Sequence, residues 1–258
     1  MELQHTRGHG GQPLAHEVAA VCVLAGRILL KNGAETFRVE DTMNRIACNF
    51  AINDAQSFVT PTGIIFSIEN TDITKLERIS ERATDLRKVT AVNDLSRQIA
   101  AGRLTVAQAY RALREIADSK RAYPVWLQIL AAAGASSCFL LMFLGNWNDV
   151  IPAFLAGAVG QAGAIYMHRL TKIKFFSEFI ASLAVGLVVL VSCKTGFGMQ
   201  LSQIIFAAVM PLVPGVPITN AVRDLMSGDL VSGLSKFAEA ALTAFAIGIG
   251  IVFALVLK

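Results

Sequence analysis

The sequence Met210-Pro211-Leu212-Val213-Pro214-Gly215-Val216-Pro217 interrupts a long apolar run near the C-terminus of this 258-residue chain. An α-helix cannot continue through it, because each proline lacks a backbone N–H donor and its ring clashes with the preceding turn. About 13 apolar residues from Leu201 precede the break and cover roughly 20 Å, less than the ~30 Å core of a bilayer. The stretch therefore predicts a broken membrane helix, followed by a short helix over Ile218–Met226.

The composition divides the chain into a polar part and an apolar part. Overall, 54% of the residues are apolar and 16% are charged, whereas soluble domains are about 25% charged. The first 124 residues hold 16 of the 23 Lys and Arg residues and 14 of the 19 Asp and Glu residues. This pattern excludes a secreted domain, a single soluble enzyme and a disordered chain. We expect a disordered tail over residues 1–13, a cytosolic α/β domain over 14–122 and a five-span transmembrane domain over 123–258.

Five apolar runs are candidates for membrane spans. The run from Leu201 is joined by Val125–Leu144, Val150–Met167, Phe175–Cys193 and Phe237–Leu257. They predict an all-α bundle of five transmembrane helices, the fourth broken at the Pro/Gly segment. Small residues recur at helical spacing in the second and last spans, at Ala153, Gly157, Gly160 and Ala164, and at Ala240, Ala244 and Gly248. They predict close packing between helices inside the bundle. The alternative is that they form a face that binds a partner, such as a second copy of the chain in a homo-oligomer.

The basic residues near the spans predict the orientation in the membrane. If there are five spans, the loops that contain these basic residues all lie on one side of the membrane. The residues are Arg111, Arg114, Lys120 and Arg121 before the first span, Arg169, Lys172 and Lys174 between the second and third, and Arg223 and Lys236 between the fourth and fifth. The opposite loops hold only Lys194. Because Lys and Arg accumulate on the cytoplasmic side, we expect the N-terminal domain to be cytosolic and the C-terminus to lie outside.

The broken helix also supplies the candidate site residues. The ends of half-helices carry partial charges that favour ions, and freed backbone groups at membrane depth must face protein or a wet cavity. Asn220 and Asp224 are four residues apart and share a face of the short helix. We predict a substrate pathway made of Pro211, Pro214, Gly215, Pro217, Asn220, Arg223 and Asp224. A plain cytosolic loop with a solvated Asp224 is the alternative.

Two carboxylates lie about one turn inside their predicted spans. Charged groups in a membrane are costly and usually functional, so Glu239 and Glu178 are candidates for proton coupling. Glu239 is preferred because it follows the broken segment directly. Interfacial placement of both is the alternative.

The polar domain is predicted to be a small sheet covered by helices on one face. Expected helices are Leu14–Lys31, Thr36–Asn49 with Thr36 as N-cap, Asp85–Ala101, and Thr105–Asp118 with a Thr105/Gln108 capping box. A hairpin is expected to join Ser57–Thr60 to Gly63–Ile68, and Ile73–Ser80 is either a third strand or an early helix.

No catalytic, cofactor or metal motif is present in the sequence. Thr36, Arg38, Glu40 and Arg45 share one helix, where an exposed face with salt bridges is preferred to catalysis. Cys22, Cys48, Cys138 and Cys193 are scattered and predicted to be small apolar fillers, and His5 and His9 belong to the tail. Cations alternate with carboxylates, which argues against nucleic acid as a partner. We therefore expect a protein that is not an enzyme.

Three blocks of sequence resemble the threonine/serine exporter family, most of all its half-length YjjP-type branch. They are Leu29–Thr36 followed by Val39-Glu40, Tyr123–Trp126, and Leu212–Asp224 followed by Gly228 and Gly233-Leu234. The resemblance implies a bacterial inner-membrane exporter of small metabolites that acts with a smaller YjjB-type membrane protein, a pair associated with the dicarboxylate succinate. The amino acids threonine and serine, exported in exchange for protons, are the alternative substrates. A membrane-anchored regulatory or sensing module is the alternative of another class.

Overall fold

The computed structural model describes residues 11–119 and 123–257. Most of the predicted tail, including His5 and His9, lies outside the described residues, as do Lys120 and Arg121. The chain divides into two compact units. The polar unit contains the described residues up to 119 together with 216–237, and the apolar unit contains 123–215 together with 238–257. The sequence-based division had instead grouped residues 216–237 with the spans.

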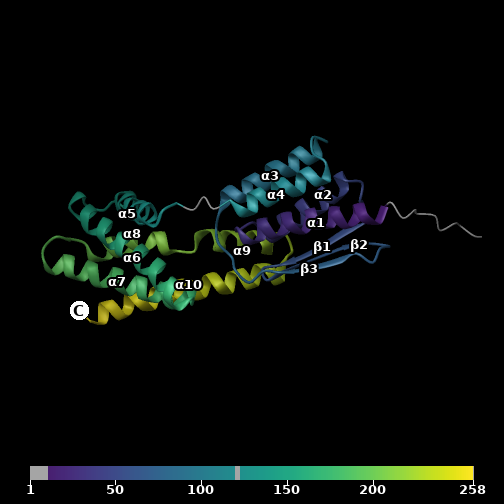
Figure 1. Ribbon diagram of the computed structural model, residues 1–258. Helices are drawn as coiled ribbons and strands as arrows, with labels where there is room; N and C mark the ends of the chain where they lie inside the picture. The colour runs from purple at the N-terminus through teal and green to yellow at the C-terminus, as the bar shows by residue number, and fades with distance from the viewer. Residues whose placement is uncertain (1–10, 120–122, 258) are drawn as a thin grey trace, which may run out of the picture. The chain divides into compact units, whose positions relative to one another are not determined.

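The polar unit contains four helices and three strands in its N-terminal part (Figure 1). They are α1 (Gly11–Lys31), α2 (Thr36–Asn49), β1 (Ala55–Thr60), β2 (Gly63–Ile68), β3 (Thr74–Arg78), α3 (Leu86–Ala100) and α4 (Val106–Asp118). The predicted helices and the hairpin are confirmed, and the ambiguous segment after Ile73 is a strand. The capping box also forms, since the Thr105 side chain accepts from the Gln108 N–H and the Gln108 side chain accepts from the Thr105 N–H.

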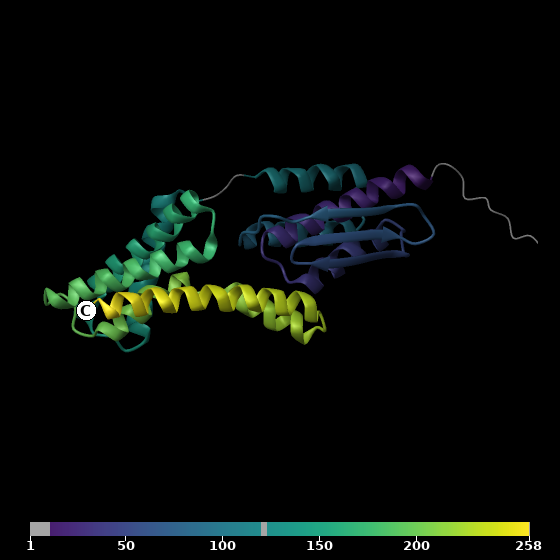
Figure 2. The same ribbon diagram turned by 90° about the horizontal axis from the view of Figure 1, so that it is seen from below.

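The sheet is antiparallel in the order β1-β2-β3 and appears face-on in Figure 2. Helices α1 and α2 lie on one face, and α3 and α4 pack against the far side of these two helices (Figure 1). Val59, Ile64 and Phe66 point into this core and are at most 1% exposed. The other face carries Phe58 and Leu76, which are 57% and 73% exposed. The sheet is therefore covered by helices on one face, as expected.

The remaining elements are mostly apolar helices. They are α5 (Val125–Met142), η1 (Trp147–Asp149), α6 (Val150–Thr171), α7 (Lys174–Lys194), α8 (Leu201–Val209), η2 (Met210–Leu212), α9 (Gly215–Met226) and α10 (Leu230–Val256). Among the described residues, four helices are long and apolar enough to cross a membrane. The segment Leu201–Leu212 and α9 meet at a 65° bend and make a fifth span if they are counted together. The predicted break is confirmed, because proline at 211 and 214 ends the regular helix.

Helix α6 packs closely against its neighbours through small residues. A Cβ atom added to Gly160 would lie 2.6 Å from Cγ2 of Val185 on α7, which is closer than real contacts allow. Gly157 meets Ser136 of α5 in the same way. The prediction of close packing is thus confirmed for the second span. On α10, by contrast, Ala244 and Gly248 are exposed.

Candidate functional site

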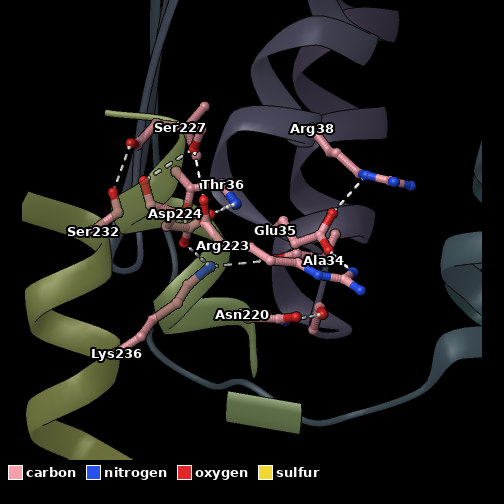
Figure 3. A network of polar contacts seen from close by, with 12 residues as sticks. Ala34, Glu35, Thr36, Arg38, Asn220, Arg223, Asp224, Ser227, Ser232 and Lys236 are labelled. Atoms are coloured by element: carbon pink, nitrogen blue, oxygen red, sulfur yellow. Dashed lines mark hydrogen bonds and ion pairs between the residues drawn. The ribbon is translucent and has the colours of Figure 1, made fainter. Parts of the chain in front are cut away.

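Two segments that are far apart in the sequence meet in the polar unit (Figure 3). One is the turn between α1 and α2, residues 33–36, and the other runs from α9 into the first turns of α10, residues 220–236. We call their polar contacts the anchor network. Both segments overlap sequence blocks that carry the family resemblance, so the structure brings together motifs separated by about 190 residues of chain.

Asp224 is the centre of the anchor network and is fully buried. Its Oδ1 accepts the backbone N–H of Thr36 at 2.9 Å, and its Oδ2 accepts the Thr36 hydroxyl at 3.0 Å. Thr36 is the first residue of α2, where N–H groups lack helical partners and the helix dipole favours a negative charge. A carboxylate from α9 therefore satisfies the N-terminus of α2.

Lys236 neutralises this carboxylate from α10. Its Nζ lies 2.7 Å from Asp224 Oδ2 and also donates to the Ala34 carbonyl at 3.4 Å. The Lys236 side chain is 9% exposed and that of Asp224 is 0% exposed. Because burying either charge alone would be very unfavourable, each of the two requires the other.

A second ion pair lies at the edge of the network. The Arg223 guanidinium donates to Glu35 Oε1, and Arg38 lies 2.6 Å from Glu35 Oε2. The Asn220 side-chain amide donates to the Gly33 carbonyl at 2.8 Å. Gly33 has a φ of +92°, the left-handed conformation that glycine adopts readily at the end of a helix. The tight turn after α1 thus presents backbone oxygens to α9 and α10.

The network corrects two predictions about α2. The N-cap is Glu35 and not Thr36, and the Glu35 side chain makes no capping hydrogen bond. The proposed exposed face of α2 is also wrong for Thr36, which is fully buried. Arg38 and Arg45 do match that prediction, since both are exposed and form ion pairs within α2 and its cap. The alternative of a solvated Asp224 is excluded by its burial.

Glu40 is partly buried beside the network and accepts the Val59 N–H at 2.7 Å. Burial raises the pKa of the Glu40 carboxyl, the Val59 N–H lowers it, and the charges of Asp229 and Asp224 raise it further. Burial is the largest of these effects. The ionised form of Glu40 is therefore less stable in the folded unit than in water.

The other predicted pathway residues lie at the helix break. Pro211 is in η2, Pro214 is buried in the link, and Gly215 and Pro217 are in the first turn of α9. The seven predicted residues thus fall into two groups. These four shape the backbone, and Asn220, Arg223 and Asp224 bond to residues 33–36.

The two carboxylates proposed for proton coupling differ in their surroundings. Glu239 Oε1 lies 3.0 Å from the Lys174 ammonium. Glu178 is one turn after Lys174 on α7, and its buried Oε2 has no hydrogen-bond partner among the described residues. A buried oxygen without a partner is uncommon and calls for an explanation.

Sequence reasoning missed two residues of the anchor network, Glu35 and Lys236 as the partner of Asp224. It also missed Asp149 in the apolar unit. Asp149 is fully buried and accepts the backbone N–H groups of Met199 at 2.6 Å and Gln200 at 3.2 Å, just before α8. The first block that carries the family resemblance contains Glu35. Lys236 lies two residues after the last block and had no such signal. A lone aspartate after a polar turn carries no comparable signal.

The described residues contain no group of three or more His, Cys, Asp or Glu side chains that could hold a metal ion. Cys22 is buried in the core, and burial raises the pKa of its thiol to about 12. It therefore acts as a small apolar side chain.

Comparison with known proteins places this architecture in a family. A probable succinate transporter subunit, YjjP, from Klebsiella aerogenes is 26% identical over 92% of this chain and 93% of its own length. The homologous subunit from Escherichia coli K12 shows the same identity and coverage. A probable threonine/serine exporter from Mycobacterium tuberculosis is 24% identical over 98% of this chain, which spans 49% of that relative. No solved structure matches the chain.

The family model described as putative threonine/serine exporter matches residues 20–258. This match covers the polar unit from the middle of α1 onward, the helix break and every candidate span. The chain is a multi-pass membrane protein of an exporter family, and it belongs to the putative threonine/serine exporter family.

Proposed function

We propose that this chain is one subunit of a secondary exporter of small metabolites in a bacterial inner membrane. The polar unit faces the cytosol, the C-terminus lies outside, and a smaller YjjB-type membrane protein completes the transporter. The observation that carries the proposal is the 65° break between Leu212 and Gly215 in a chain of an exporter family. Broken helices are a recurrent basis of substrate sites near the bilayer midplane.

The substrate path runs beside the break. Pro214 cannot donate a backbone hydrogen bond, so the regular helical pattern stops there, and the Met210 carbonyl accepts the Val213 N–H at 3.2 Å instead. Pro211 lies in η2 just before the break, and Gly215 and Pro217 lie in the first turn of α9 just after it. Asn220, Arg223 and Asp224 hold α9 in place through the anchor network.

The preferred substrate is a dicarboxylate such as succinate. An anion that leaves a cell with a negative interior gains about 2.3 kcal/mol per charge for every 100 mV. Export of a dianion is therefore driven by the voltage alone. A zwitterion such as threonine gains nothing from the voltage and needs proton exchange, for which Glu178 and Glu239 are the candidates. The unpartnered Oε2 of Glu178 favours that residue.

The test is efflux of labelled succinate and threonine from liposomes that contain the chain with and without its small partner. The double variant Pro214→Ala, Gly215→Ala should abolish efflux while the protein still inserts. Asn220→Ala should act in the same direction, because it removes the bond to Gly33. Asn49→Ala is the matched control, since Asn49 is exposed and its side-chain amide donates to the Arg45 carbonyl within α2. Wild-type efflux in the first two variants would contradict the proposal.

A membrane-anchored sensing module is the second candidate. It is favoured by a cationic groove in the polar unit, which is described below. Deleting the polar domain would not separate the two functions, because deletion would leave Asp224 and Lys236 without Thr36 and Ala34. The liposome assay does separate them: a sensing module gives no efflux with or without a partner.

A further inference from the structure

A groove of about 540 Å³ lies in the polar unit, and none of the anchor-network residues lines it, although its lining residue Asn32 is next to Gly33 in the chain. Its floor is formed by α1, one wall by β3, and the other wall by α4 and the start of α3. Figure 1 shows α1 between α4 and the sheet, which is why these elements share one hollow. The volume is within the range of small-molecule sites, about 300–1,000 Å³.

The groove has a marked excess of positive charge. Five cationic side chains line it: Arg27, Lys31, Lys75, Lys88 and Arg114. Only two carboxylates, Glu77 and Asp118, line it with them. Like charges gathered around a partly enclosed space repel one another, and a bound anion would relieve this repulsion.

Three of these cations form no salt bridge within 4.0 Å among the described residues, and Asp118 acts on Arg114 only from a longer distance. Lys75 donates to the His16 carbonyl at 3.4 Å, Lys88 to the Ala117 carbonyl at 2.7 Å, and Arg114 to the Tyr110 hydroxyl at 3.0 Å. Arg27 and Lys31, in contrast, pair with Glu77 at 3.2 Å and Glu81 at 3.9 Å. The unpaired charges are available to a ligand.

The floor of the groove is apolar. Ala20, Val23, Leu24 and Ile28 follow one face of α1 beneath the charged rim. On the wall, the Arg114 guanidinium lies 5.4 Å from the centre of the Tyr110 ring. A carbon skeleton can rest on this floor while its acidic groups reach the rim.

We propose that this groove binds an organic anion that carries two or more negative charges. The combination of an apolar floor, three unpaired cations and a net excess of three positive charges favours such a ligand over an inorganic ion, which would leave the floor uncovered. This proposal concerns the polar unit alone and does not depend on the exporter assignment.

The test is calorimetric titration of the full chain in nanodiscs at about 150 mM salt, with succinate, citrate and ADP as separate probes. We expect at least one probe to bind with one-to-one stoichiometry. Arg114→Gln and Lys75→Gln should each weaken this binding at least tenfold, and Arg114→Lys should retain most of it. Lys88 is avoided, because it also satisfies a carbonyl at the end of α4.

Arg97→Gln is the matched control. It removes the same charge from an exposed position on α3 that pairs with Asp94, outside the groove. The proposal is overturned if no probe binds, or if the control weakens binding as much as Arg114→Gln does. It is also overturned if Asn220→Ala abolishes binding while Arg114→Gln leaves it intact, because the anion would then occupy the transport path.

Discussion

Asp224→Ala should release the anchor network. The substitution removes the acceptor of two hydrogen bonds from Thr36 and leaves the Lys236 ammonium buried without a counter-charge. Removing one partner of a buried ion pair costs about 3–5 kcal/mol, mainly because the remaining charge is uncompensated. Exposed ion pairs, in contrast, contribute about 1 kcal/mol or less.

Hydrogen exchange of the full chain in nanodiscs measures this loss locally. A cost of about 3 kcal/mol corresponds to exchange that is at least ~100-fold faster, at 1.36 kcal/mol per tenfold change. We expect this acceleration in residues 33–40 and 220–236, and little change in β2. Asp94→Ala is the control, because it breaks an exposed pair with Arg97.

A second substitution separates the buried charge from the lost hydrogen bonds. In the Asp224→Ala background, Lys236→Met removes the orphan ammonium and should restore part of the protection. Acceleration below about threefold in Asp224→Ala would refute the reasoning. So would a double variant that exchanges faster than Asp224→Ala alone.

Three further perturbations test other parts of the structure. Glu40→Gln should stabilise the polar unit more at pH 7 than at pH 4, as measured by thermal unfolding. The pKa of Glu40 is raised in the folded state, so the native unit binds more protons than the unfolded chain does. The wild-type unit therefore loses stability as the pH rises from the unfolded-state pKa to the folded-state pKa, whereas the variant with the neutral glutamine does not. A pH-independent effect would contradict this. Gly160→Ala should destabilise the apolar unit by about 1–3 kcal/mol, because the new methyl group would overlap Val185. If the melting temperature of the variant equals that of the wild type, α6 and α7 can separate without cost and the reasoning is wrong. Asp149→Ala should cost about 1–2 kcal/mol and speed exchange at the start of α8, since two N–H groups lose their acceptor, whereas Asp149→Asn should retain part of the protection.

Much of the fold was predictable because its causes are local. Runs of about 20 apolar residues predicted the long helices, and the two short runs Ser57–Thr60 and Gly63–Ile68 predicted the hairpin. The capping box at Thr105 and the break at Pro214 follow from the chemistry of a few neighbouring residues. Boundaries were less certain: α10 begins at Leu230, seven residues before the predicted Phe237.

The candidate site was predictable only in part. The sequence singled out Asn220, Arg223 and Asp224 through their position after the break. It did not indicate their partners, and it assigned Thr36 to an exposed face. A side chain bonded to another 188 residues away has no periodic or spacing signal in a single sequence.

The sequence by itself determined where this chain is helical, where it is apolar enough for lipid and where its fourth span must break, because proline geometry and side-chain hydrophobicity act within a few residues. Only the tertiary structure decided that residues 216–237 pack with the polar unit, that Asp224 holds the N-terminus of α2, and that five cations surround one groove. These features depend on which distant surfaces meet when the chain folds, and charge pairing and burial act across space without regard to distance along the chain.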